Sequence, residues 1–249
     1  MQNLSLILLI LSIIIVFLFL NDLNLPILIG SFIWYLIVVG IGVSIVLHRE
    51  LSHNSLIVNK FFRNFVLTIF TATTAISPCS WVVVHKTHHK FSDKEFDPHP
   101  PTAKGIFNNI IGNIQVPKKE GIIFSKSILI NEYINFLHRH NNKVSILLLI
   151  ILTFLGPSYL LAWALVFLGY KIQSILNAYL AHKVGYRNFD LKNDSTNEPI
   201  TTIISFGEGL HNNHHANPSN PNFSYKSFEI DIGFKLIQLF QKIKLVQIK

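Results

Sequence analysis

The sequence predicts an all-α membrane protein with four transmembrane helices, an interfacial helix and a cytosolic His-rich cap. Three observations lead to this fold class. Half of the 249 residues are hydrophobic, and only 14% are charged, against about 25% in ordinary soluble domains. Long uncharged stretches alternate with polar segments. No internal repeat or long linker divides the chain, so we expect a single domain over residues 1–249.

The first two predicted crossings form a hairpin. Residues 4–20 are apolar apart from two serines, and residues 26–47, opened by Pro26, form a second apolar run. Each run is long enough to cross a bilayer. All 21 Lys and Arg residues follow His48, and cytoplasmic loops carry the Lys and Arg excess. We therefore expect the turn outside and the chain after His48 inside, and we interpret the net charge of +8 as an orientation signal, with no nucleic acid as partner.

The third apolar stretch is expected to lie in the membrane interface. Residues 61–84 are mostly apolar, but they include Arg63, Asn64, Pro78 and Ser80. We predict one helix that is half-embedded in the inner interface. The loop that follows, residues 86–143, is mostly polar and is expected in the cytosol.

The last apolar stretch, residues 144–170, allows two interpretations. As one tilted span it would place the tail outside, whereas a hairpin turning at Gly156–Pro157–Ser158 would return the tail to the cytosol. The basic residues of the tail favour the hairpin, with transmembrane helices at about 144–156 and 158–181. This arrangement requires Lys171 to snorkel to the polar boundary.

Nine of the 12 histidines form four clusters at the ends of predicted elements. The motifs are HRELSH, HKTHH and HNNHH, with one single histidine at the inner end of the last span; the residues are His48, His53, His85, His88, His89, His182, His211, His214 and His215. Residues three or four apart share one face of a helix, so each HxxHH motif presents its imidazoles in one direction. In the predicted topology, all four clusters meet at the inner membrane boundary.

This histidine set predicts two metal ions. Imidazole suits Zn, Cu, Fe and Ni, and nine ligands exceed a single site but suit two ions with four or five ligands each. The single Cys79 excludes a disulfide framework, a Cys-ligated zinc site and an iron–sulfur cluster. A lone HxxxxH motif is more often a surface or pH-responsive feature, but several clusters at one level of the membrane indicate metal.

Two alternatives compete with this interpretation. Ferritin-like di-iron bundles use Glu-x-x-His motifs, which Glu50-x-x-His53 and Glu208-x-x-His211 match. That scheme needs two further bundle glutamates, and the remaining candidates, Glu95, Glu120 and Glu132, lie in polar loop sequence. A metal carrier or sensor is the alternative from another class. A transporter is expected to place its ligands near the bilayer midplane, whereas these histidines lie at span ends.

The ordered set HRELSH, HKTHHKFSDKEFDPHPP, HKVGYRNFD and GEGLHNNHHANP resembles the membrane fatty acid desaturases of the acyl-CoA/acyl-lipid delta-9 type, over about residues 26–240. The resemblance implies four transmembrane helices, a cytosolic cap and a centre of two iron ions (Fe2+) ligated by the nine clustered histidines. It also implies insertion of a cis double bond into a saturated acyl chain with O2 and two electrons. A fatty acyl or lipid hydroxylase on the same scaffold is the alternative. Either enzyme would be a multi-pass protein of the bacterial inner membrane or endoplasmic reticulum, with its site on the cytosolic side.

Two positions depart from the family pattern. The family usually carries an Asn four residues before the histidine matched by His182, and this Asn contributes to one iron through a water. Here that position is Ala178, and Asn177 is the candidate substitute, although one residue rotates a helical side chain by about 100°. Animal acyl-CoA desaturases carry charged residues just before the second motif, where this chain has Val83 and Val84. This difference favours an acyl-lipid or acyl-carrier-protein substrate over acyl-CoA.

The remaining assignments surround this centre. Trp81 is a candidate wall of the acyl tunnel, with an interfacial anchor as the alternative. Four acidic residues are candidates to orient the outer ring nitrogens of the ligands, with capping or surface roles as the alternative: Asp93, Asp97, Glu208 and Asp231. Three histidines outside the motifs are expected to be loop residues: His99, His138 and His140. We expect electrons from a separate protein, and the basic cytosolic face suits an acidic donor of the cytochrome b5 or ferredoxin type.

Overall fold

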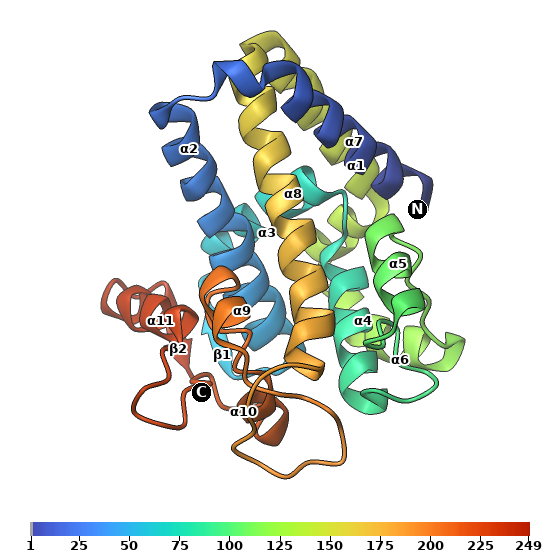
Figure 1. Cartoon of the computed structure of the whole chain (residues 1–249), viewed down its shortest axis with the longest axis vertical. Coiled ribbons are helices and arrows are strands. Elements are labelled where there is room, and N and C mark those ends of the chain that lie inside the picture. The colour runs from blue at the N-terminus through green and yellow to red at the C-terminus, as the bar shows by residue number, and fades with distance from the viewer. Residues whose placement is uncertain (1) are drawn as a thin grey trace.

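The computed structural model describes residues 2–249, with side chains from Leu4 onward, and is mainly helical. Its long helices are α1 (Gln2–Phe19), α2 (Leu25–Tyr35) continued by η2 (Leu36–Ser52), α7 (Glu132–Leu155) and α8 (Pro157–Tyr179). Helix α8 contacts α1, α2 and α7. In Figure 1 the turns between α1 and α2 and between α7 and α8 lie at the upper end of the molecule, and the shorter elements lie mainly toward the lower end.

The shorter elements complete the chain. They are η1 (Leu20–Asp22), β1 (Leu56–Val58), α3 (Lys60–Thr74), α4 (Pro78–Phe91), α5 (Ala103–Ile111), α6 (Lys118–Leu129), η3 (Leu180–His182), α9 (Pro199–Ile204), α10 (His211–Ala216), α11 (Ile232–Lys242) and β2 (Val246–Ile248). The two strands pair antiparallel, with Leu56 opposite Ile248 and Val58 opposite Val246. This pairing joins the end of the chain to the segment that follows the first histidine motif.

Within the described residues 2–249, three helical segments are long and apolar enough to cross a membrane: Leu4–Asp22, Leu25–Ser52 and Pro157–His182. The predicted span 144–156 is the second half of α7, and α7 as a whole is not among these segments. The reason is length, because the uncharged stretch of α7 begins only at Val144 and its 12 residues extend about 18 Å. The turn predicted at Gly156–Pro157 is present, since α7 ends at Leu155 and α8 begins at Pro157.

The predicted single interfacial helix over residues 61–84 is wrong, because two helices occupy this stretch. Helices α3 and α4 meet at an angle of 87°, and together they too are long and apolar enough for one bent span. Ala75 ends α3 in the left-handed region (φ 57°). The Ser77 side chain then accepts a hydrogen bond from the Ser80 N–H (3.1 Å), and Pro78 opens α4. A capping serine followed by Pro at the first position is a strong helix start.

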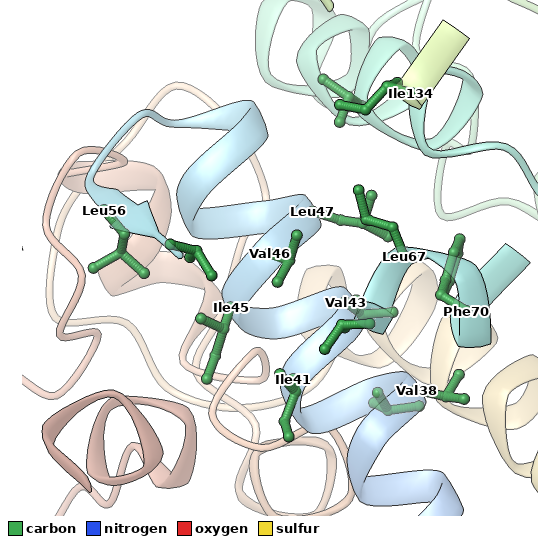
Figure 2. Close-up of a cluster of buried hydrophobic side chains, with 14 of the residues drawn as sticks. Val38, Ile41, Val43, Ile45, Val46, Leu47, Leu56, Leu67, Phe70 and Ile134 are labelled. Atoms are coloured by element: carbon green, nitrogen blue, oxygen red, sulfur yellow. The ribbon is translucent and has the colours of Figure 1, made fainter. Parts of the chain in front are cut away.

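Helix η2 lies at the centre of the hydrophobic core. Figure 2 shows apolar side chains pointing from several sides of η2 toward its neighbours, including Leu67 and Phe70 of α3. Val38, Ile45 and Leu47 are completely buried. A helix that is apolar all round belongs in an interior, and burying each of these side chains is worth about 1.5–3 kcal/mol. The core therefore fixes the helix that carries the first histidine motif.

The snorkelling of Lys171 to the membrane boundary stays a prediction. Its side chain is only 6% exposed, and its ammonium group donates to the Ser5 hydroxyl of α1 at 3.0 Å. Helix α5 packs against both α1 and α8, so the lysine reaches polar groups that belong to the protein itself.

Candidate metal centre

The first histidine motif is placed by the wide geometry of η2. In a π-helix each N–H bonds the carbonyl oxygen five residues earlier, and η2 keeps this pattern to its end, where the His53 N–H donates to the His48 carbonyl oxygen (3.1 Å). In an α-helix, residues five apart would point about 140° away from each other. The π geometry brings His48 and His53 to one side, which a rule based on spacings of three and four does not predict.

The other motifs sit on short helical segments. His85, His88 and His89 lie near the end of α4, His182 ends η3, and α10 carries His211, His214 and His215. The capped start of α4 fixes the direction in which its histidines point.

The nine histidines come together in two groups. The first group contains His48, His53, His85, His89 and His214, and the second contains His88, His182, His211 and His215. In each group the nitrogens that face one another all lie within 4.8 Å. Helices α4 and α10 contribute to both groups, so the two groups are adjacent. All nine predicted histidines are thus brought together, divided into five and four.

The inner nitrogens have the spacing that a shared metal ion requires. In the first group, the Nε2 atoms of His53 and His85 are 2.8 Å apart, and that of His214 lies 2.9 Å from His48. In the second group, Nε2 of His215 lies 3.0 Å from that of His211. Two nitrogens bound at right angles to one ion, each at about 2.1 Å, would be about 3 Å apart.

Carboxylates hold three of the outer ring nitrogens. Nδ1 of His48 contacts Glu208. Nδ1 of His88 lies 3.0 Å from Asp97, and Nδ1 of His182 lies 3.0 Å from Asp93. An ionised carboxylate only accepts, so each of these rings carries its proton on Nδ1 and turns the Nε2 lone pair inward.

This arrangement fits a cation. Nε2 of His182 is buried and has no hydrogen-bond partner among the residues that the structure describes. Inward lone pairs repel one another, and a metal ion placed between them would satisfy all of them. The contacts confirm the predicted partner role of three acidic residues, Asp93, Asp97 and Glu208.

The fourth acidic prediction, Asp231, is wrong as a partner of an imidazole. Asp231 accepts a hydrogen bond from Arg49 Nη2 (2.9 Å) and caps α11 by accepting from the Phe234 N–H (2.9 Å). Arg49 is 1% exposed and also donates from Nη1 to Glu208 (2.8 Å). Asp231 therefore contacts no imidazole; it binds Arg49, which in turn binds Glu208.

Burial keeps the imidazoles of α10 neutral. It lowers the pKa of His211, His214 and His215 well below the ordinary histidine value. Burial alone would raise the pKa of Asp97, but the hydrogen bond from the His88 ring outweighs this effect and holds the pKa of that carboxyl well below its usual range. Neutral imidazoles and ionised carboxylates are the protonation states that bind a cation.

The ferritin-like alternative is wrong. Glu50 pairs with Arg63 at 3.1 Å, and Glu208 pairs with Arg49. Neither glutamate belongs to the groups of potential ligand atoms among the residues that the structure describes. Both glutamates act in ion pairs around the histidines.

One histidine outside the predicted motifs, His99, lies beside the centre. The ring of His99 stacks on that of His88, with centroids 4.5 Å apart, and His88, Asp97 and His99 form a further group of potential ligand atoms. The available signal was its position two residues after Asp97. His99 lies in a loop, as expected, but the expectation of loop positions is wrong for His138 and His140, because both lie on α7. His138 Nδ1 lies 2.8 Å from the Ser77 hydroxyl, near the start of α4.

A cavity of about 450 Å3 reaches the two histidine groups. His85, His88 and His211 line it, as does Trp81, whose ring stacks on that of His85 with centroids 5.1 Å apart. Asn177 also lines the cavity, and its Oδ1 is buried without a hydrogen-bond partner in the part of the chain that the structure describes. The cavity gives an elongated ligand access to the inner nitrogens.

Comparison with known proteins identifies the family. The model of the family described as fatty acid desaturase matches residues 5–228. The chain belongs to the fatty acid desaturase family. This desaturase is 30% identical over 218 residues to the sn-1 stearoyl-lipid 9-desaturase of Anabaena variabilis, covering 83% of this chain and 78% of that protein. It is 27% identical to Delta-9 acyl-lipid desaturase 1 of Arabidopsis thaliana (83% and 70% covered). It is also 29% identical to icosanoyl-CoA 5-desaturase of Limnanthes douglasii (82% and 60% covered).

These relationships confirm the resemblance of the ordered histidine motifs. This desaturase is an oxidoreductase that acts on fatty acyl chains, and its apolar helices make it a membrane protein. The histidine groups described above are compatible with metal binding.

Proposed function

We propose that this desaturase uses two iron ions and O2 to introduce a cis double bond at the delta-9 position of a saturated acyl chain. One observation carries the proposal. Nine imidazoles divide into groups of five and four, and in three of them a carboxylate on the outer nitrogen directs the Nε2 lone pair inward. Imidazole is a suitable ligand for iron, and two ions with four or five ligands each account for the whole set.

The chain's own residues prepare this centre. Asp93, Asp97 and Glu208 fix the tautomer and orientation of three imidazoles. Iron, when bound, supplies the O2 chemistry that removal of hydrogen from an unactivated methylene requires. Asn177 is proposed to contribute to one ion through a water, because its unpaired Oδ1 lines the same cavity as His88 and His211.

The substrate is proposed to be an acyl-lipid. Its acyl chain would lie in the cavity against Trp81. The apolar pair Val83–Val84 before the second motif disfavours CoA, and the relatives from Anabaena and Arabidopsis are named for acyl-lipid substrates. We further propose a four-crossing protein of the bacterial inner membrane or endoplasmic reticulum. Its site would face the cytosol, where a cytochrome b5 or ferredoxin type of donor supplies electrons to a basic surface.

Expression in a host without its own desaturase tests the proposal. Double bonds located by mass spectrometry are expected at carbon 9, and metal analysis of the purified chain is expected to find two irons per molecule. His88→Ala should abolish unsaturation and reduce bound iron, whereas His140→Ala, on α7 outside both groups, should change neither. A hydroxylated product would favour the hydroxylase alternative, and unchanged unsaturation in the His88 variant would contradict the assigned centre.

A further inference from the structure

Lys171 is a buried cation inside a membrane-spanning helix. It lies within the segment Pro157–His182, and its side chain is only 6% exposed. Charged residues are costly at such positions, and those that occur there commonly face a partner, a substrate or a water-filled cavity. The metal centre does not use this lysine, which is not among its potential ligand residues.

The hydrogen-bond partners of Lys171 are all neutral. Its Nζ donates to the Ser5 hydroxyl at 3.0 Å and to the carbonyl oxygens of Asn109 and Ile110 at 3.4 Å. Among the residues that the structure describes, no carboxylate lies within 4.0 Å of this ammonium group. A buried charge without a counter-charge is destabilising, so an anion brought to this point would gain a strong, charge-assisted interaction.

The same cavity that reaches the histidines also reaches Lys171. Ser5, Asn109, Lys171 and Ser174 line it together with His85, His88 and His211. The Ser174 hydroxyl donates to Asn109 Oδ1 (3.2 Å), which makes this part of the lining polar. Along α8, Lys171 lies about 9 Å from Asn177, and His182 follows on η3 beyond the end of this helix. One elongated molecule can therefore contact the lysine with a polar end and the histidine groups with an apolar chain.

We propose that Lys171, assisted by Ser5, is an anion-binding subsite that holds a negatively charged oxygen group at the polar end of the acyl substrate. The proposed acyl-lipid substrate would offer the phosphate of a phospholipid; the carboxylate of a fatty acid shares this chemistry, and the test below distinguishes the two. The ammonium group is a compact point charge suited to either. That an anion binds at Lys171 is argued from the geometry alone. That this anion belongs to an acyl substrate rests on the proposed function. If the subsite anchors the polar end, the distance from Lys171 to the histidine groups sets which carbons are reached.

A binding experiment on the full-length protein in detergent tests this subsite without relying on turnover. The probes are stearate, distearoyl phosphatidylglycerol and the uncharged distearoylglycerol, and the variants are Lys171→Met, Lys171→Gln and Lys171→Arg. Both neutral variants should bind one or both anionic probes about tenfold more weakly or worse, with unchanged affinity for distearoylglycerol. Lys171→Arg and the exposed control Lys235→Met of α11 should bind like the wild type. If only stearate binds more weakly to the neutral variants, the group held by Lys171 is a carboxylate. If phosphatidylglycerol binds more weakly, the group is a phosphate.

Thermal unfolding separates binding from folding. Replacing an uncompensated buried charge by an apolar residue is often neutral or stabilising, so ligand-free Lys171→Met should unfold at or above the wild-type midpoint. The subsite is overturned if the neutral variants bind both anions with wild-type affinity. It is also overturned if these variants have a lower unfolding midpoint and no longer bind any of the three probes. If expression yields no double bond but anion binding still requires Lys171, the proposed function fails and the subsite stands. If double bonds form and binding ignores Lys171, the subsite alone fails.

Discussion

At the scale of single residues, the outer partners of the imidazoles decide what the centre can bind. Asp97 lies nine residues after its partner His88. The other two carboxylates are far from their partners in the sequence, because Glu208 contacts His48 and Asp93 contacts His182. Each carboxylate fixes a proton on Nδ1 and leaves the inner nitrogen as a lone-pair donor. The charge of the carboxylate also increases the attraction of the site for a cation.

Asp97→Asn tests this role. The change keeps the shape of the side chain but removes its charge, so iron affinity is expected to fall about 10–100-fold, with a parallel loss of desaturation. Metal content after dialysis against graded chelator measures the effect. Glu95→Gln, an exposed position in the same loop, is the matched control and should retain its iron. Full iron retention in the Asp97 variant would show that the charge is dispensable.

The sequence predicts the histidines better than it predicts their partners. Eight of the nine histidines fall in motifs with recognisable spacing, and His182 stands alone at a span end, whereas an acidic residue near a motif has several possible partners. Asp231 illustrates the difficulty, because Arg49 binds it and the arginine could not be placed from the sequence. His99 was missed for a related reason: its ring stacks on His88 through a loop whose path no spacing rule predicts.

At the scale of elements, the buried Arg49 joins three segments. It donates from η2 to Glu208 before α10, to Asp231 at the start of α11 and to the carbonyl oxygen of Pro221 (2.9 Å). Its guanidinium carbon also lies 3.7 Å from the centre of the Phe223 ring. The planar fork of arginine suits several acceptors at once, which a lysine cannot match.

Arg49→Met is therefore expected to be strongly destabilising. It leaves Glu208 and Asp231 buried without their cation, a loss of about 3–5 kcal/mol for a broken buried pair. Thermal unfolding in detergent measures the change. The unfolding midpoint of Arg49→Lys should lie between those of Arg49→Met and the wild type. Arg139→Met, exposed on α7, should stay within about 0.5 kcal/mol of the wild type. Equal midpoints for Arg49→Met and the wild type would exclude this joining role.

Element boundaries follow the sequence where a capping signal is strong. The turn at Gly156–Pro157 was predictable because glycine and proline together end one helix and open the next. The break between α3 and α4 also carried a start signal at Ser77–Pro78, but no glycine marked the end of α3, because Ala75 occupies the left-handed position. The π geometry of η2, whose residues are largely buried, was equally hidden.

At the scale of the whole molecule, an apolar bundle carries a cluster of ionisable groups that must stay neutral to bind metal. Imidazoles gathered in one place would repel one another if protonated, and burial lowers the pKa of His211, His214 and His215 well below the ordinary value. The same burial makes the stability of the metal-free protein sensitive to acid, because these histidines bind protons more readily in the unfolded chain than in the folded centre.

Acidification is therefore expected to destabilise the metal-free protein. Burial lowers the pKa of His99 from 6.5 to about 4, and the pKa values of His211, His214 and His215 move in the same direction. Between these values the unfolded state binds protons and the folded state does not. The stability is thus fully present above about pH 6.5 and is lost as the pH falls toward 4; the share of His99 is at most about 3 kcal/mol.

Thermal unfolding of the chelator-treated protein at pH 7.5 and pH 5 measures this dependence. The wild type should unfold at a distinctly lower temperature at pH 5. His99→Gln removes one titrating group, so its midpoint should fall less between the two pH values. His140→Gln, on α7 away from the centre, should reproduce the wild-type change. Identical pH dependence in the wild type and His99→Gln would show that His99 takes up its proton in the folded state, which would contradict its burial against His88. A smaller fall in His99→Gln alone would link the acid sensitivity of the whole molecule to the packing of its histidine centre.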